Sequence, residues 1–104
     1  MSKRERANSA GDGVTPAGGA GPKWTQEEAI AYECACDYLA EVLGIYSGEL
    51  DVEGAREVPR QDRVTWLEDE ITRLRKVRRQ LRVSDHEAIA EIRSVYGALL
   101  RRSL

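Results

Sequence analysis

Apolar residues recur every three or four positions through three stretches of the chain, which is the spacing of one face of an α-helix. The first stretch covers about residues 25–47, and a T-x-x-E capping box at Thr25 and Glu28 predicts where its helix begins. The pair Ser47-Gly48 predicts where it ends, because Gly favours the backbone conformation that closes helices. Its apolar positions are Tyr32, Ala35, Tyr38, Leu39, Val42, Leu43, Ile45 and Tyr46.

Two more helices are predicted in the second half of the chain. The second covers about residues 60–82, and its apolar spacing is close to that of a coiled-coil seam, with Arg78 at a position where a strict heptad has an apolar residue. Its seam positions are Val64, Leu67, Ile71, Leu74, Val77 and Leu81. The third covers about residues 85–102 and follows a second capping box, at Ser84 and Glu87. Residues 48–59 lack helical periodicity and are predicted to form a loop.

Only one or two residues separate the second and third predicted helices, so we expect them to fold back as a long antiparallel hairpin. Both helices begin with acidic residues and end with basic ones, so this pairing sets opposite charges together at both ends. Gly44 and Gly97 lie inside predicted helices and indicate notches where two helices approach closely. The predicted fold is all-α: a small three-helix protein over residues 24–104, with a coiled-coil-like hairpin in its C-terminal half.

Residues 1–23 are rich in Gly and Ala and hold few large apolar side chains, so we expect a disordered tail. No apolar run approaches the roughly 20 residues of a membrane span, and no apolar stretch follows the basic N-terminus as in a secretory signal. We therefore expect a cytoplasmic protein without membrane contact. Arg far outnumbers Lys, and Ala and Gly are frequent, which is typical of a GC-rich bacterial genome.

The net charge of −2 hides an uneven distribution. Residues 24–58 carry one Arg against nine acidic residues, whereas residues 59–104 carry eleven Lys and Arg against seven acidic residues. The favoured interpretation is that the acidic and basic parts face each other within one fold. The alternative is that each part faces a binding partner.

The most basic segment is RLRKVRRQLR, residues 73–82, which is a candidate contact for nucleic-acid phosphates or an acidic partner. Its basic residues are Arg73, Arg75, Lys76, Arg78, Arg79 and Arg82. They flank an apolar seam, and no aromatic side chain is interleaved for base stacking. The turn that follows is too tight for a helix-turn-helix motif. Nucleic-acid binding through this segment and the basic N-terminal tail is therefore the alternative function, and a solvated, salt-bridged helix end is the simpler interpretation.

Both cysteines lie in a C-x-C pair, Cys34 and Cys36, inside the first predicted helix. Since each helical residue turns by about 100°, the two side chains point about 200° apart. They are then unable to bond to each other or to chelate one metal ion, and we expect each to pack as a small apolar residue. The nearby acidic stripe lacks the Glu-x-x-His pair of helical metal sites, and the single histidine, His86, lies at a helix start.

No nucleophile–base pair, G-x-S-x-G motif, H-E-x-x-H motif or Gly-rich phosphate loop is present in the sequence. We therefore expect no enzyme activity, no catalytic residue, no cofactor, no metal and no small-molecule substrate. The leading hypothesis is a small helical protein–protein interaction or regulatory module, with self-association as a homodimer one form of it. The candidate interaction face on the first helix consists of Tyr32, Tyr38, Leu39 and Tyr46.

Overall fold

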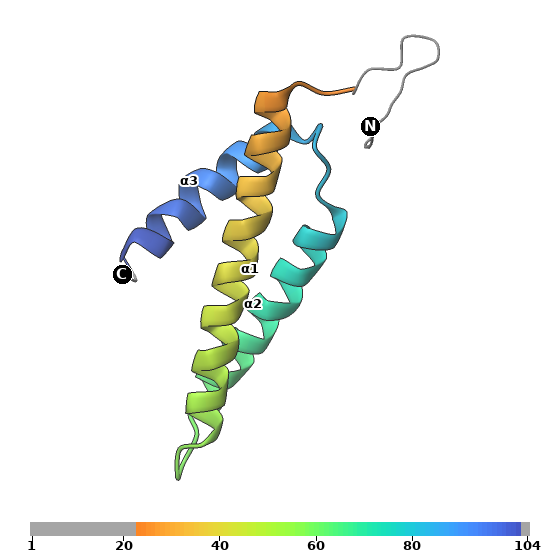
Figure 1. Ribbon diagram of the computed structural model, residues 1–104. Helices are drawn as coiled ribbons and strands as arrows, with labels where there is room; N and C mark the ends of the chain where they lie inside the picture. Colours follow the sequence, from red (N-terminus) through yellow and green to blue (C-terminus); the bar gives the residue numbers. More distant parts are fainter. Residues whose placement is uncertain (1–22, 103–104) are drawn as a thin grey trace, which may run out of the picture.

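The computed structural model describes residues 23–102 as three α-helices (Figure 1). Helix α1 covers Gln26–Gly54, α2 covers Gln61–Gln80 and α3 covers His86–Arg102. This part of the chain contains no β-strand, which confirms the all-α prediction. None of its helices is both long enough and apolar enough to cross a membrane. The predicted N-terminal tail lies almost wholly outside the described residues.

The start of α1 is determined by its own local sequence. The Thr25 hydroxyl accepts a hydrogen bond from the Glu28 backbone N–H at 3.1 Å, and the Glu28 carboxylate accepts one from the Thr25 N–H at 2.7 Å. These two bonds satisfy backbone donors that have no partner within the helix. The predicted capping box is therefore confirmed.

The end of α1 differs from the sequence prediction. The helix passes through Gly48 and continues to Gly54, so the loop expected over residues 48–59 is helical in its first half. The added turns carry the buried Glu53, whose carboxylate bonds to Arg60 at the start of α2. A single Gly inside a helix costs only about 1 kcal/mol, so contacts of this kind outweigh it.

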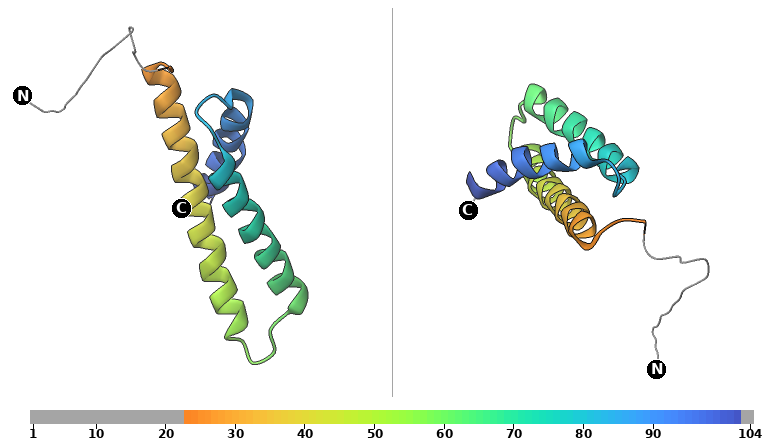
Figure 2. Two further views of the ribbon diagram at one scale, coloured as in Figure 1. Left: turned by 90° about the vertical axis from the view of Figure 1, so that its right-hand side faces the viewer. Right: turned by 90° about the horizontal axis from the view of Figure 1, so that it is seen from above.

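Helices α1 and α2 form an antiparallel pair. After a short connection α2 returns along α1, and the two helices lie side by side (Figure 1, Figure 2). Helix α2 buries Leu67 and Ile71 along this pair. The Tyr46 and Trp66 rings meet edge to face with their centroids 5.4 Å apart. The long hairpin of this fold is therefore formed by the first and second helices.

The predicted close pairing of the second and third helices is wrong. No Cα atom of α2 lies within 8 Å of a Cα atom of α3, whereas both helices approach α1 that closely. Helix α3 instead crosses the first half of α1 at an angle (Figure 1, Figure 2). Five residues, 81–85, separate the two helices rather than one or two, and this longer connection lets α2 and α3 diverge.

All three helices contribute to one core beside the middle of α1. Ala35, Leu39 and Val42 have no exposed surface, so α1 supplies the centre of this core. Its other buried members, from α2, α3 and the connection between them, are Leu74, Leu81, Ile89 and Ile92. Burying each such leucine or isoleucine contributes roughly 1.5–3 kcal/mol.

Helix α3 begins at His86, directly after Asp85. The Asp85 carboxylate accepts a hydrogen bond from the Arg82 backbone N–H at 2.8 Å, and its carbonyl accepts one from the Ile89 N–H at 2.9 Å. Asp85 therefore occupies the cap position that the sequence pattern assigned to Ser84.

The two glycines predicted to be notches differ from each other. A Cβ atom added at Gly97 would lie 3.2 Å from Cε2 of Tyr38, so α3 approaches α1 closely there and a larger residue would require the Tyr38 ring to shift by a few tenths of an ångström. A Cβ atom added at Gly44 would meet nothing within 4 Å in the described part of the chain. The prediction is confirmed for Gly97 and wrong for Gly44.

Candidate interaction groove between α2 and α3

A groove of about 250 Å³ opens between the diverging helices α2 and α3, and we call it the α2–α3 groove. Its apolar lining comes from both helices: Leu74, Val77, Ala88, Ile92 and Val95. Its polar lining is Arg73, Glu91 and Tyr96. Apolar side chains bordered by a few charged ones are typical of surfaces that bind the face of another helix.

The groove arises from the way in which α3 packs. Ile89 and Ile92 are buried, but 52% of the surface of Val95, three residues after Ile92, is exposed. The apolar face of α3 is therefore wider than the strip that α1 covers. Since the backbone of α2 diverges from α3, the rest of that face stays open toward the groove.

Arg73 connects the two helices at the groove. Its guanidinium donates to both carboxylate oxygens of Glu70, at 2.7 and 3.2 Å, and to the Tyr96 hydroxyl at 2.8 Å. The hydrogen bonds from Arg73 hold the pKa of the Glu70 carboxyl below its usual value, and the same bonds raise the pKa of Arg73. A bidentate pair of this kind fixes the side chain, so a positive charge has a defined position in the groove lining.

The other basic residues of segment 73–82 are exposed, and among the described residues none of their side chains forms an ion pair. They are Arg75, Lys76, Arg78, Arg79 and Arg82. Within residues 23–102, the salt-bridged helix end that the sequence favoured is therefore found only at Arg73. The remaining cations have no ion-pair partner in the described part of the chain, and we call them the α2 basic surface.

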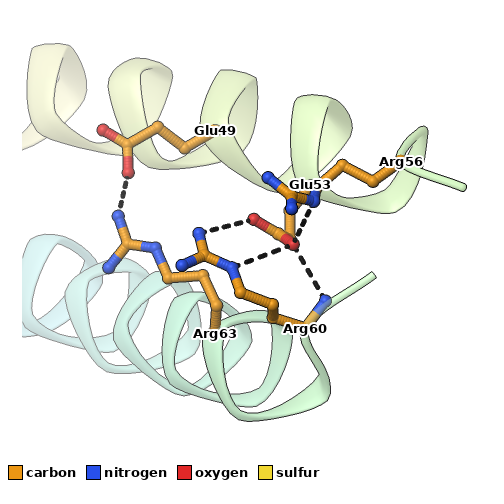
Figure 3. A network of polar contacts seen from close by, with 5 residues as sticks. All are labelled: Glu49, Glu53, Arg56, Arg60 and Arg63. Atoms are coloured by element: carbon orange, nitrogen blue, oxygen red, sulfur yellow. Dashed lines mark hydrogen bonds and ion pairs between the residues drawn. The ribbon is translucent and has the colours of Figure 1, made fainter. Parts of the chain in front are cut away.

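The acidic middle of the chain meets basic residues where α1 turns into α2 (Figure 3). Glu53 is 5% exposed and accepts hydrogen bonds from the Arg60 backbone N–H at 2.9 Å and from its guanidinium at 3.0 Å. Arg56 Nε lies 3.2 Å from the same carboxylate, and Arg63 pairs with Glu49. The bonds from Arg60 lower the pKa of Glu53 to about 2. This network holds the end of α1 and the start of α2 together.

A second link joins the start of α3 to the start of α1. His86 Nε2 lies 2.6 Å from a carboxylate oxygen of Glu28. The hydrogen bond from the Thr25 backbone N–H, and after it the bond to His86, lower the pKa of Glu28. His86 therefore lies at a contact between helices rather than at an isolated helix start.

Three of the four residues predicted as an interaction face, Tyr32, Leu39 and Tyr46, recur every seven positions and lie on one side of α1, whereas Tyr38 faces α3. Leu39 is fully buried in the core. Tyr32, Tyr38 and Tyr46 are half-buried and pack against that core, with Tyr38 also against Gly97 of α3 and Tyr46 against Trp66 of α2. The structure therefore does not bring these four side chains together on one exposed surface.

Cys34 and Cys36 are free thiols, and both are half-buried. Each forms a hydrogen bond with a tyrosine one helical turn away, Cys34 with Tyr38 and Cys36 with Tyr32, and these bonds raise the pKa of both tyrosines. The two thiols thus lie on different flanks of α1. Within residues 23–102 no three His, Cys, Asp or Glu side chains are arranged to hold a metal ion.

Sequence reasoning missed the α2–α3 groove. The signal was present in the third helix, because Ala88, Ile92 and Val95 repeat at spacings of four and three, beside the set that includes Ile89. Two overlapping apolar sets on one helix indicate two contact surfaces.

Comparisons of the chain with protein families, with curated proteins and with solved structures found no match.

Proposed function

We propose that the protein is a non-enzymatic helical interaction module, and that the α2–α3 groove binds the apolar face of a partner helix. The observation that carries this proposal is the open apolar face of α3, on which Val95 is half exposed beside the buried Ile92. Covering an exposed valine in an apolar groove between two helices stabilises the complex by about 25 cal/mol for each Å² of apolar surface removed from water.

The groove has the composition that a helical ligand requires. Its apolar lining offers Ile92 and Val95 from one helix and Leu74 and Val77 from the other, so that a ridge of apolar side chains fits between them. The fixed positive charge of Arg73 and the carboxylate of Glu91 offer polar contacts of both signs to a partner. Such contacts orient a ligand more than they strengthen its binding.

Binding of short amphipathic helices tests this proposal. Stapled peptides with apolar residues at i, i+3, i+4 and i+7 are titrated into dilute protein and followed by fluorescence anisotropy. We expect at least one peptide to bind, and Val95→Glu to weaken it at least about tenfold, because the new carboxylate is desolvated in the groove. Ser94→Glu adds the same charge at an exposed neighbouring position, and we expect it to change the affinity for the peptide by less than about twofold.

Absence of binding by every peptide contradicts the proposal, as does equal binding by the wild type and the Val95→Glu variant. Circular dichroism of both variants checks that their helix content equals that of the wild type. Since Val95 is half exposed, its replacement leaves the three-helix core intact.

We propose phosphate binding by the α2 basic surface as a second candidate function. The observation that favours it is the lack of any ion pair, within the described residues, at five of the six basic side chains of segment 73–82. Two of them, Lys76 and Arg79, fall on the outward side of α2, away from the buried Leu67 and Leu74. Unpaired cations on one helix face attract the phosphates of a nucleic acid.

The salt dependence of DNA or RNA binding tests this second function. If three to five phosphates of duplex DNA are neutralised, log K falls with log salt with a slope of about −2.7 to −4.5. We expect the Lys76→Glu/Arg79→Glu double variant to reduce that slope by about two. The same two-charge reversal at Arg93 and Arg101 of α3 is the matched control. A slope near zero, or equal slopes for the two double variants, overturns this function.

A further inference from the structure

We infer that the occupant of the α2–α3 groove is α3 of a second copy of this chain, which gives a two-fold dimer whose two α3 helices run antiparallel. This inference rests on the proposed function, because it assigns a ligand to the same groove. The groove is lined partly by α3 itself. A two-fold axis beside α3 therefore places the α3 of each copy in the groove of the other.

The sequence of α3 and its cap matches itself in the antiparallel direction. One seam runs along it at alternating spacings of three and four, through Asp85, Ala88, Ile92, Val95, Leu99 and Arg102. A two-fold axis between residues 93 and 94 sets Ile92 against Val95 of the second copy. The same axis sets the small Ala88 against the larger Leu99, so the apolar layers have complementary sizes.

The charges at the ends of this seam are also complementary. The same register places Asp85 of one copy against Arg102 of the other, at both ends of the helix pair. Asp85 accepts the Arg82 N–H with one carboxylate oxygen, which leaves its second oxygen for an arginine. Arg102 is exposed and forms no ion pair among the described residues. A parallel pairing would instead bring like charges together at each end.

The direction of the pairing also follows from the helix dipoles. Further acidic residues, Glu87 and Glu91, lie in the first half of α3, and a further base, Arg101, lies near its end. Antiparallel helices set the positive end of one dipole beside the negative end of the other. In this dimer each α2 forms the outer wall of a groove, and α2 and α3 from both copies make a four-helix core.

The mass of the full-length protein in solution tests the dimer. Light scattering coupled to gel filtration, over a hundredfold range of concentration and with a reductant present, is expected to give twice the 11.6 kDa of one chain at the upper end. Val95→Glu is expected to weaken dimerisation by about 100-fold or more, because two carboxylates enter the apolar seam. Ser94→Glu lies off the seam, and we expect the dimer to form as in the wild type.

A charge reversal tests the register. Arg102→Glu places two acidic groups together at each end of the seam, and we expect dimerisation to weaken by about tenfold. Arg101→Glu makes the same charge change one residue earlier, on the α1 side beside Gly97. We expect it to weaken dimerisation by less than about threefold. Equal effects of the two reversals overturn the antiparallel register.

The failure of this inference is distinguishable from failure of the groove itself. One-chain mass at every concentration, together with helical peptides that still depend on Val95, overturns the second copy as occupant and leaves the groove as a binding site. A dimer mass that persists in Val95→Glu overturns this inference, because the copies then meet elsewhere. One-chain mass without any peptide binding overturns both proposals.

Discussion

Leu39→Ala is expected to lower the free energy of unfolding by about 3–4 kcal/mol. Leu39 has no exposed surface and lies in the part of α1 against which both other helices pack. Truncation removes the apolar contacts of the side chain and leaves a cavity, and both losses add in well-packed cores. Since small domains are stable by only about 5–15 kcal/mol, this single change removes a large share of the total.

Urea unfolding followed by circular dichroism measures this change. Ile30→Ala removes apolar atoms from the same helix, but Ile30 is 55% exposed and lies outside the core cluster. We expect that control to lose less than about 0.5 kcal/mol. If the two variants lose equal stability, α1 does not pack with its Leu39 face toward the other helices.

The sequence allowed the helices to be predicted where their ends are determined locally. The capping box of Thr25 and Glu28 needs only four consecutive residues, and the structure contains both of its hydrogen bonds. The all-α class followed from apolar periodicity for the same reason, because the period of a helix is a local property. Features of this kind depend on neighbours along the chain.

The end of α1 was not predictable in this way. Gly48 carries a local stop signal, but Glu53 and its partner Arg60 hold two further turns in helical form across the connection to α2. A contact between residues seven positions apart, through a turn, has no signature in helical periodicity. The local signal was weaker than the tertiary contact that opposed it.

The sequence pattern also did not predict which helix packs against α2. The seam of α2 fits any apolar helix with the same spacing, so periodicity does not distinguish α1 from α3 as its neighbour. The structure pairs α2 with α1, whose inner face carries the fully buried Ala35, Leu39 and Val42. The α2–α3 groove exists because of that choice, and so a prediction that paired α2 with α3 could not include it.

Neutralising Glu53 is expected to remove a contact that stabilises the α1–α2 turn and to change how stability depends on pH. The carboxylate is buried and accepts three bonds from Arg60 at 2.9–3.4 Å, while the arginine remains largely open to solvent. Glu53→Ala leaves the Arg60 backbone N–H and guanidinium without this acceptor. We expect the melting temperature to fall by about 5–10 °C.

The pH dependence follows from the pKa of Glu53, which the bonds from Arg60 lower from 4.5 to about 2. Because the pKa is lower in the folded state, this carboxylate stabilises the fold fully above pH 4.5. The stabilisation is then lost progressively as the pH falls from 4.5 toward 2. Glu53→Gln lacks the titrating group, so its stability is expected to fall less steeply over that interval.

Thermal melts of the wild type, Glu53→Gln and Glu57→Gln between pH 2 and pH 7 separate this effect from a general change in charge. Glu57 is exposed in the connection between α1 and α2, and within the described residues it forms no ion pair. We therefore expect its variant to follow the wild-type curve. Glu28 and Glu70, whose pKa values are also lowered, retain part of the acid dependence in every variant. If the Glu53→Gln curve ran parallel to that of the wild type below pH 4.5, the Glu53–Arg60 network would not hold the turn in solution.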